Sequence, residues 1–405
     1  ARRQAKLRRH EGGVVEHHRR ESRHGRHSER GSRHRRAHGG GVQSRGRVEA
    51  SLGKVVASRA RRVVRDVTSS LASMSLASRI DGIDAKLSRE FAAAFGDAVC
   101  DELEREGDEA LASRLRRILH CADAETATEV ADEMYGDLKR TGTWATPSHR
   151  ECYVLAELRR CVGLLREGGG EAARRAMKAV DMAFIVGAPG DALAEFVQTT
   201  ELALDVETTR RRAYVKSEVG SGWLFPQSPP QPTVADDRRF IGRVDGRLSR
   251  KEFKTAYYNT DTPVVLVGLG AEWPAMTKWD DLRWWRDRHG HRSVPLELGK
   301  YHDNTWREDV KTLAEFIDEH MVPSISGRAP GDDVAYLAQH QLVDQLSDLS
   351  SDFVPPEYCQ KSLERINVWM GTAGTITPCH FDTYDNLLGQ VRLIDLALDA
   401  RIPGV

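Results

Sequence analysis

The stretch Gly374-Thr-Ile-Thr-Pro-Cys-His-Phe-Asp382, followed by Asn386, decides the fold of this chain. It places a His-x-Asp pair, His380 and Asp382, after the β-like run Thr375–Thr377. Residues i and i+2 of a strand point to one face, so both side chains could reach one ion. Such a pair supplies two of the three ligands in the two-His-one-carboxylate site of non-haem Fe(II) oxygenases. The ordinary alternative for an isolated pair is a half-buried histidine beside an aspartate in a turn.

Length and composition allow two or three domains with buried cores, since the chain has 405 residues and 40% hydrophobic content. The net charge of zero hides an asymmetry, because residues 1–65 hold 20 Lys and Arg against 5 Asp and Glu. The six cysteines form no CxxC pair, which favours reduced thiols in the nucleus or cytoplasm over a disulfide framework. No apolar run is long enough to cross a bilayer, so we expect no membrane partner.

Residues 1–65 form a basic arm that we expect to be disordered, because its first 48 residues contain few apolar side chains. An arm for nucleic acid or nuclear import is one interpretation. A solvated tail, or sequence translated from an incorrectly chosen start, is the interpretation we favour. We therefore do not expect a nucleic-acid partner, and any binding of nucleic acid would have to involve this arm.

Residues 83–204 carry a helical pattern, with apolar residues spaced three and four apart. Helix breaks are expected at Gly136, Thr141–Pro147, Gly168–Gly170 and Gly187–Gly190. Short breaks predict antiparallel neighbouring helices, and helix-hairpin repeats are an open alternative. A linker rich in Gly and Pro is expected over 205–238.

Residues 239–405 read as mixed α and β structure, so the overall fold class is α+β. Capping boxes at Ser249–Glu252 and Thr312–Glu315 predict helix starts. Short apolar or β-branched runs predict four strands, at Pro263–Val267, Ser293–Leu298, Val334–Ala338 and Ile366–Met370.

The stretch from Pro263 to Val391 resembles the Jumonji-C (JmjC) oxygenases, and within them the group of JmjC domain-containing protein 5, or lysine demethylase 8. The blocks Tyr336-Leu-Ala-Gln-His-Gln341 and Gly374–Asp382 carry most of this resemblance. Further matching blocks are PVVLVG at 263–268, Trp273-Pro274, VPLELG at 294–299 and INVWMG at 366–371. The helical segment, above all Ala173–Leu193 with Met182-Ala-Phe184, looks like the N-terminal region of the same group.

The resemblance implies a double-stranded β-helix, Fe(II) as cofactor and 2-oxoglutarate as co-substrate. It implies hydroxylation of a protein side chain: arginine as first choice, or methyl-lysine with demethylation, in a protein such as a histone or a ribosomal protein. His380 and Asp382 match metal ligands. Thr377, Asn386 and Tyr336 match positions that bind 2-oxoglutarate.

Four residues match substrate-side positions: Glu297, Trp306, Gln339 and Trp369. A carboxylate with an aromatic partner suits a guanidinium or a methylated cation. The alternatives without a binding role are a solvated strand residue for Glu297 and packing beside the site for Trp369. For Tyr336 the alternative is a core aromatic, and for Asn386 a turn residue. Cys379 is expected to point away and to be structural.

The resemblance ends near Val391, and the lysine and the distal histidine of the family do not follow. We therefore expect an incomplete β-helix, a truncated reading frame and an inactive, poorly stable C-terminal half with Thr375–Cys379 as an unpaired edge. Two function classes remain open. The gene product is a 2-oxoglutarate oxygenase, or this chain acts without catalysis as a protein-interaction module through its helical domain.

Overall fold

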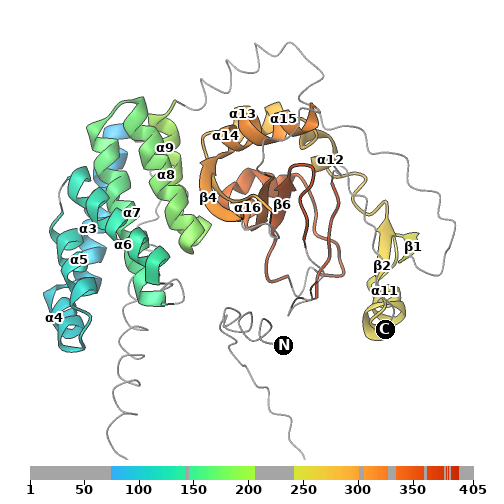
Figure 1. The fold of residues 1–405 in the computed structure, drawn as a ribbon, viewed down its shortest axis with the longest axis horizontal. Helices are drawn as coiled ribbons and strands as arrows, with labels where there is room; N and C mark the ends of the chain where they lie inside the picture. The colour runs from blue at the N-terminus through green and yellow to red at the C-terminus, as the bar shows by residue number, and fades with distance from the viewer. Residues whose placement is uncertain are drawn as a thin grey trace, which may run out of the picture.

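The computed structural model describes residues 74–121, 123–141, 146–205, 241–300, 305–326, 334–359, 363–377, 380, 382 and 385–391. Within them, a helical domain precedes a domain built on an antiparallel sheet (Figure 1). This confirms the α+β class. The expected basic arm, Cys379 and all but Asp205 of the expected linker lie outside the described residues.

The helical domain consists of successive helices that pack on one another around one core. Its helices are α3 (Leu76–Phe95), α4 (Asp97–Arg105), α5 (Glu109–His120), α6 (Ala124–Thr141), α7 (Pro147–Glu167), α8 (Gly170–Val186) and α9 (Gly190–Ala203). The first helix begins seven residues earlier than the expected start at Ile83. Met182, Ala183 and Phe184 are buried, as a core position requires.

Three of the four expected helix breaks are confirmed, and the fourth is wrong. The breaks around Thr141–Pro147, Gly168–Gly170 and Gly187–Gly190 fall between helices. Gly136 lies inside α6, which continues through it to Thr141. A single glycine in a helix costs only about 1 kcal/mol, and the apolar positions on both sides of Gly136 are buried against the bundle.

The second domain begins with a small parallel pair, β1 (Gly242–Asp245) and β2 (Val264–Val267), and with helix α11 (Arg250–Ala256). Its main sheet has the order β4-β3-β5-β6 and is antiparallel throughout. The strands are β3 (Ser293–Leu298), β4 (Arg307–Thr312), β5 (Ala335–His340) and β6 (Val368–Gly371). Both expected capping boxes are present, at Ser249–Glu252 and at Thr312–Glu315.

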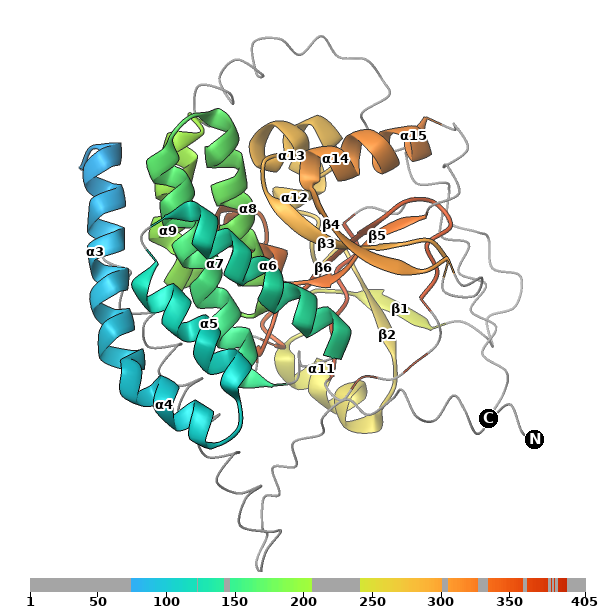
Figure 2. The same ribbon diagram turned by 60° about the vertical axis from the view of Figure 1, so that its left-hand side comes forward.

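Short helical segments cover one face of this sheet (Figure 2). They include α13 (Leu282–His289), α14 (Leu313–Phe316), the π-helical turn η5 (Ile317–Met321) and α16 (Leu342–Gln345), with α12 (Ala275–Lys278), α15 (Val322–Ile325), η4 (Tyr258–Thr260) and η6 (Ser347–Ser351) around them. Trp285, Phe316 and Ile317 pack there against Leu296 and Leu337 of the sheet. The burial of these large apolar side chains fixes which face of each strand points inward.

Two expectations about the last part of the sheet need correction. Residues 372–377, together with His380 and Asp382, lie outside any strand, so Thr375–Thr377 is not a β-run. The expected unpaired edge at Thr375–Cys379 is therefore not found in its described part, Thr375–Thr377. Thr375 instead turns back, and its Oγ1 donates to the carbonyl of Thr372 at 2.8 Å.

No described helix is long and apolar enough to cross a membrane.

Candidate active site on the open face of the sheet

The face of the main sheet that is not covered by α13, α14 and η5 carries the candidate site. Along β3, Val294, Leu296 and Leu298 are buried, whereas the alternate residue Glu297 is half-buried. Since side chains alternate along a strand, Glu297 points away from the core. The same rule places its partners in register on the same open face.

A row of paired residues crosses the sheet at Glu297. Glu308 of β4 lies opposite Glu297, and Tyr336 of β5 lies opposite it on the other side. Gly371 of β6 continues the row as the partner of Tyr336. Trp306 precedes β4 two residues before Glu308 and Trp369 lies two residues before Gly371, so alternation puts both indoles on this face.

Tyr336 lies against Thr377 at the centre of this row. Burial raises the pKa of the Tyr336 phenol, and a side-chain hydrogen bond with Thr377 opposes that increase. A Cβ at Gly371 would come within 2.9 Å of the Tyr336 ring and 2.7 Å of Thr375 Oγ1. A glycine is therefore needed at 371 for the ring to lie across β6 toward Thr377.

Glu297 contacts Trp306, as the expected substrate-side pairing requires. Trp306 Nε1 donates to Glu297 Oε2 at 3.3 Å. The Trp306 side chain is 40% exposed and Trp369 is 46% exposed. This exposure favours a role on the open face for Trp369, and the alternative of packing beside the site stays open.

Gln339 sits at an irregularity in β5. The pairing with β6 shifts between Leu337 and His340, which marks a β-bulge. Gln339 has a φ of 51°, a left-handed conformation that few residues other than glycine adopt. Bulges of this kind re-aim a side chain, and strained positions cluster at functional sites. The Gln339 side chain is exposed.

His380 and Asp382 lie together, but beyond the sheet rather than on a strand. His380 Nε2 is 3.5 Å from Asp382 Oδ1. Two atoms that ligate one metal at about 2.1 Å lie about 3 Å apart, so this pair is near, and slightly wider than, the spacing for a shared ion. The nitrogen and oxygen donors suit Fe(II). Within the described residues no cluster of three or more His, Cys, Asp or Glu gathers around a common point.

Among the contacts of the described residues, Asn386 bonds to Asp382 and not to Tyr336 or Thr377, the residues expected to share 2-oxoglutarate with it. Its Nδ2 donates to Asp382 Oδ2. Contacts among the described residues link Trp306, Glu297, Tyr336 and Thr377 on one side, and His380, Asp382 and Asn386 on the other. The turn alternative for Asn386 stays open, since residues 385–390 lie in no helix or strand.

Glu308 is a residue on this face that sequence reasoning missed. Its strand reads Arg-Glu-Asp-Val-Lys-Thr, which lacks the apolar alternation typical of strands. Only the register with β3 shows that Glu308 faces Glu297. Alternation from Trp306 was the one signal in the sequence that could have indicated it.

Comparison with known proteins fits this geometry. A family model described as a cupin-like domain matches residues 250–392. The chain is 30% identical to "Lysine-specific demethylase JMJ30" of Arabidopsis thaliana over 301 residues, 68% of each protein. This chain belongs to the JmjC family.

Two further JmjC relatives match over shorter stretches. "Jumonji C domain-containing protein 5" of Drosophila melanogaster is 33% identical over 184 residues, 42% of this chain and 45% of the fly protein. "Lysine-specific demethylase 8" of Xenopus tropicalis is 36% identical over 149 residues, 35% of this chain and 32% of the frog protein. The resemblance to JmjC oxygenases is thereby confirmed, while the chain spans less than half of these two relatives.

Proposed function

We propose that this chain belongs to an Fe(II)- and 2-oxoglutarate-dependent oxygenase that hydroxylates a protein side chain, with arginine as the preferred target. Demethylation of methyl-lysine is the second choice, supported by the names of the plant and frog relatives. One observation carries the proposal: Glu308, Glu297 and Tyr336 form one row on the open face. Trp306 and Trp369 border that row.

His380 and Asp382 are the residues that would hold the iron, through Nε2 and Oδ1. The iron, when bound, supplies the oxidising centre for oxygen-dependent hydroxylation of a C–H bond. Asn386 holds the second oxygen of Asp382 and so keeps its first oxygen turned toward His380. Residues that form hydrogen bonds with a metal ligand commonly fix its orientation in this way.

Tyr336 and Thr377 are the residues that would hold a carboxylate of 2-oxoglutarate. Both hydroxyl groups can donate to an anion, and their mutual hydrogen bond aligns them. Burial on the sheet raises the pKa of Tyr336, so the phenol keeps its proton and stays a donor at neutral pH.

The substrate cation is proposed to bind between the carboxylates and the indoles. A guanidinium has five donors in a planar fork and stacks on aromatic rings, so it can use Glu297, Glu308 and Trp306 together. A trimethylated ammonium would use the ring but donate no hydrogen bond. Two carboxylates in register therefore favour arginine.

We further propose that the described residues alone hold Fe(II) weakly and do not support turnover. The described residues bring two protein ligands to the site, and facial-triad oxygenases use three.

The test is binding of 2-oxoglutarate to the full chain, measured by calorimetry without oxygen in the presence of Fe(II). We expect Tyr336→Phe to weaken binding about tenfold, the loss expected when a hydrogen bond to a charged group is removed. Tyr358→Phe is the matched control, because the single Tyr358 hydroxyl hydrogen is shared between the carbonyls of Gly246 and Leu248, which are not candidate site residues. His380→Ala should lower the affinity for Fe(II). Equal affinity in all variants, or no binding by the wild-type chain, would contradict the proposal.

A further inference from the structure

The helical domain meets the sheet through a buried charged cluster. Asp181 of α8 is fully buried, and Arg292 at the start of β3 is 4% exposed. Arg292 Nη2 donates to Asp181 Oδ1 at 2.6 Å and its Nε at 3.0 Å. The backbone N–H of Ser293 donates to Asp181 Oδ2 at 2.7 Å. One carboxylate of the helical domain thus holds the beginning of β3.

The same carboxylate reaches β5 through a glutamine. Gln345 Nε2 donates to Asp181 Oδ1 at 2.8 Å and to the carbonyl of Ser293 at 2.9 Å. Its Oε1 lies 2.7 Å from Nε2 of His340, the last residue of β5. Both amide hydrogens of Gln345 are already used, so Oε1 accepts and His340 Nε2 carries the proton.

His340 is held on its other side by the helical domain as well. The Phe184 ring of α8 meets the His340 ring edge to face, with centroids 5.8 Å apart. Burial lowers the pKa of His340, so the ring is neutral at physiological pH. A neutral ring donating one hydrogen bond to Gln345 and packed on Phe184 has little freedom to move.

His340 directly follows the strained residue of the sheet. The bulge in β5 spans Leu337 to His340, and Gln339 has the left-handed φ within it. Strained backbone conformations persist only where several surrounding contacts hold them in place. The fixed ring of His340 on one side and the ladder pairing of Leu337 with Met370 on the other supply that constraint.

We propose that Asp181 is a positioning residue: through Gln345 and His340 it sets the bulge that presents Gln339 to the substrate side of the site. The inference rests on the proposed function for the role of Gln339. The helical domain is then part of the machinery that shapes the site, and not a separable interaction module. Buried ionic groups are retained in some proteins because they specify one arrangement, and here that arrangement is the register of two domains.

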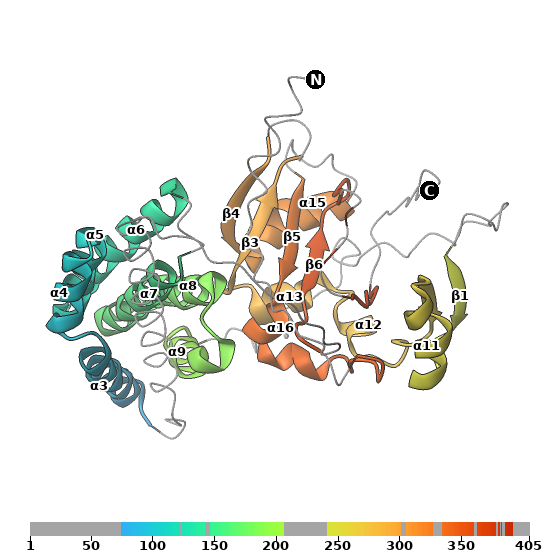
Figure 3. The same cartoon turned by 90° about the horizontal axis from the view of Figure 1, so that it is seen from below.

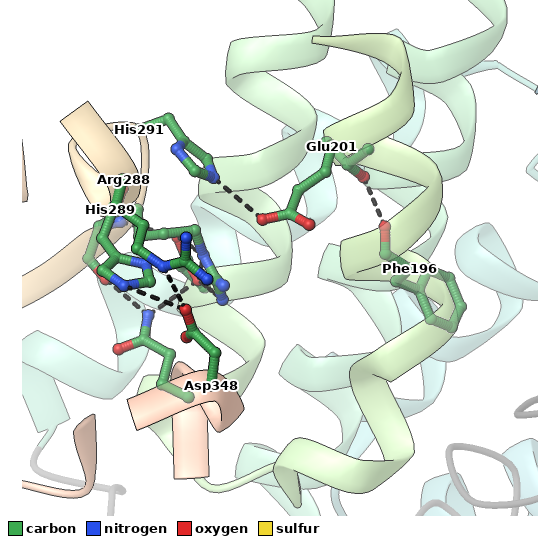
Figure 4. Close-up of polar contacts among 11 residues, drawn as sticks. Phe196, Glu201, Arg288, His289, His291 and Asp348 are labelled. Carbon is green, nitrogen blue, oxygen red and sulfur yellow. Dashed lines mark hydrogen bonds and ion pairs between the residues drawn. The ribbon is translucent and has the colours of Figure 1, made fainter. Parts of the chain in front are cut away.

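Other contacts cross the interface outside the connection from Asp181 through Gln345 to His340. His291 Nε2 lies 3.3 Å from Glu201 Oε1 of α9 (Figure 4). A Cβ on Gly190 would come within 2.4 Å of the Asp344 carbonyl, so α9 lies directly against α16. Figure 3 shows α8 and α9 on the side of the sheet domain that carries α16. Glu201→Gln is therefore a matched control, because it loosens the same interface at a different place.

The first measurement is hydrogen exchange of the backbone amides of residues 335–340 in the full chain. We expect Asp181→Asn and Gln345→Ala to speed this exchange about tenfold, the effect of losing a hydrogen bond to a charged group, while Glu201→Gln leaves it unchanged. Gln345→Ala keeps the ion pair between Arg292 and Asp181, so it decides the matter if Asp181→Asn fails to fold. Unchanged exchange in Gln345→Ala would overturn the proposal.

The second measurement is a double-mutant cycle on binding of an arginine-containing peptide. If Gln345 acts through Gln339, Gln345→Ala and Gln339→Ala each lower the peptide affinity. The affinity of the double variant should then be no lower than that of the single variant with the lower affinity. Additive losses would overturn the proposed link. No peptide binding by the wild-type chain would count against the proposed function, and the exchange measurement would still decide the positioning role.

Discussion

Glu297 of β3 lies directly opposite Glu308 of β4 in an antiparallel pair. Side chains in such positions have Cβ atoms about 5 Å apart, and like charges there are destabilising. Within the described part of the chain, the partner of Glu297 is the indole of Trp306, and Glu308 forms no ion pair. A repulsive pair beside exposed aromatic rings is what a site for a cation requires before the cation arrives.

The first prediction is that Glu308→Gln makes the protein more stable and a worse binder. Removing one of two facing charges should raise the free energy of unfolding by about 0.5 kcal/mol. The affinity for an arginine-containing peptide should fall about tenfold, since one charge-assisted hydrogen bond is lost. Chemical denaturation and calorimetry measure the two effects.

Asp309→Asn is the matched control for Glu308→Gln. It removes the same charge from the neighbouring residue of β4, whose partner Leu296 faces the core side of the sheet. We expect its peptide affinity to equal that of the wild type. If both variants weaken binding equally, the effect comes from net charge and the register argument fails.

The second prediction separates two tryptophans of the same domain. Trp369 is 46% exposed on the open face, whereas Trp285 is 1% exposed in the core. Trp369→Ala should change the free energy of unfolding by less than about 1 kcal/mol and weaken peptide binding. Trp285→Ala should lose about 4 kcal/mol, because it leaves a large cavity. Urea denaturation of both variants tests this, and a large loss of stability in Trp369→Ala would show that its ring is a packing residue.

Local patterns in the sequence were enough to predict much of the second domain. The run Ser293–Leu298 became β3 with the same bounds, because its apolar residues alternate and are flanked by turn residues. Both capping boxes formed because each depends on side chains only three residues apart. The break at Gly136 failed since tertiary packing outweighs the small cost of one helical glycine.

The site was predictable in its residue types but not in its arrangement. A family motif placed His380 and Asp382 together, whereas the strand expected at Thr375–Thr377 did not form. The contact of Asp181 with Arg292 spans 111 residues of sequence, so no local pattern could reveal it. Register and domain docking are set by long-range packing, and one sequence carries no direct record of either.

The third prediction concerns pH and Glu157 in the core of the helical domain. Glu157 is 2% exposed, and Tyr153 donates to its Oε1 at 2.5 Å. Burial raises the pKa of Glu157 to about 7, against the opposing effects of Arg160 and of the Tyr153 hydroxyl. The folded state therefore holds a proton that the unfolded state releases above about pH 4.5.

The stabilising contribution of protonated Glu157 should be fully present below about pH 4.5 and lost as the pH rises through about 7. The loss amounts to about 3 kcal/mol between those limits. Urea denaturation at about pH 5 and about pH 8 should show it in the wild type and not in Glu157→Gln. Glu125→Gln, at an exposed position of α6, should keep the wild-type dependence. A Glu157→Gln variant with the full wild-type dependence would rule out this residue as its source.

The last prediction uses two glycines of neighbouring helices. A Cβ on Gly163 of α7 would come within 2.6 Å of the Ala124 Cα, so α6 and α7 touch there. Gly136 of α6 has open space around the place a Cβ would take. Gly163→Ala should therefore lower the free energy of unfolding by about 2 kcal/mol through overpacking. Gly136→Ala should raise it by about 1 kcal/mol, because alanine is the better helix former. Urea denaturation of the two variants checks both signs, and a stabilising Gly163→Ala would mean that α6 and α7 can separate at little cost.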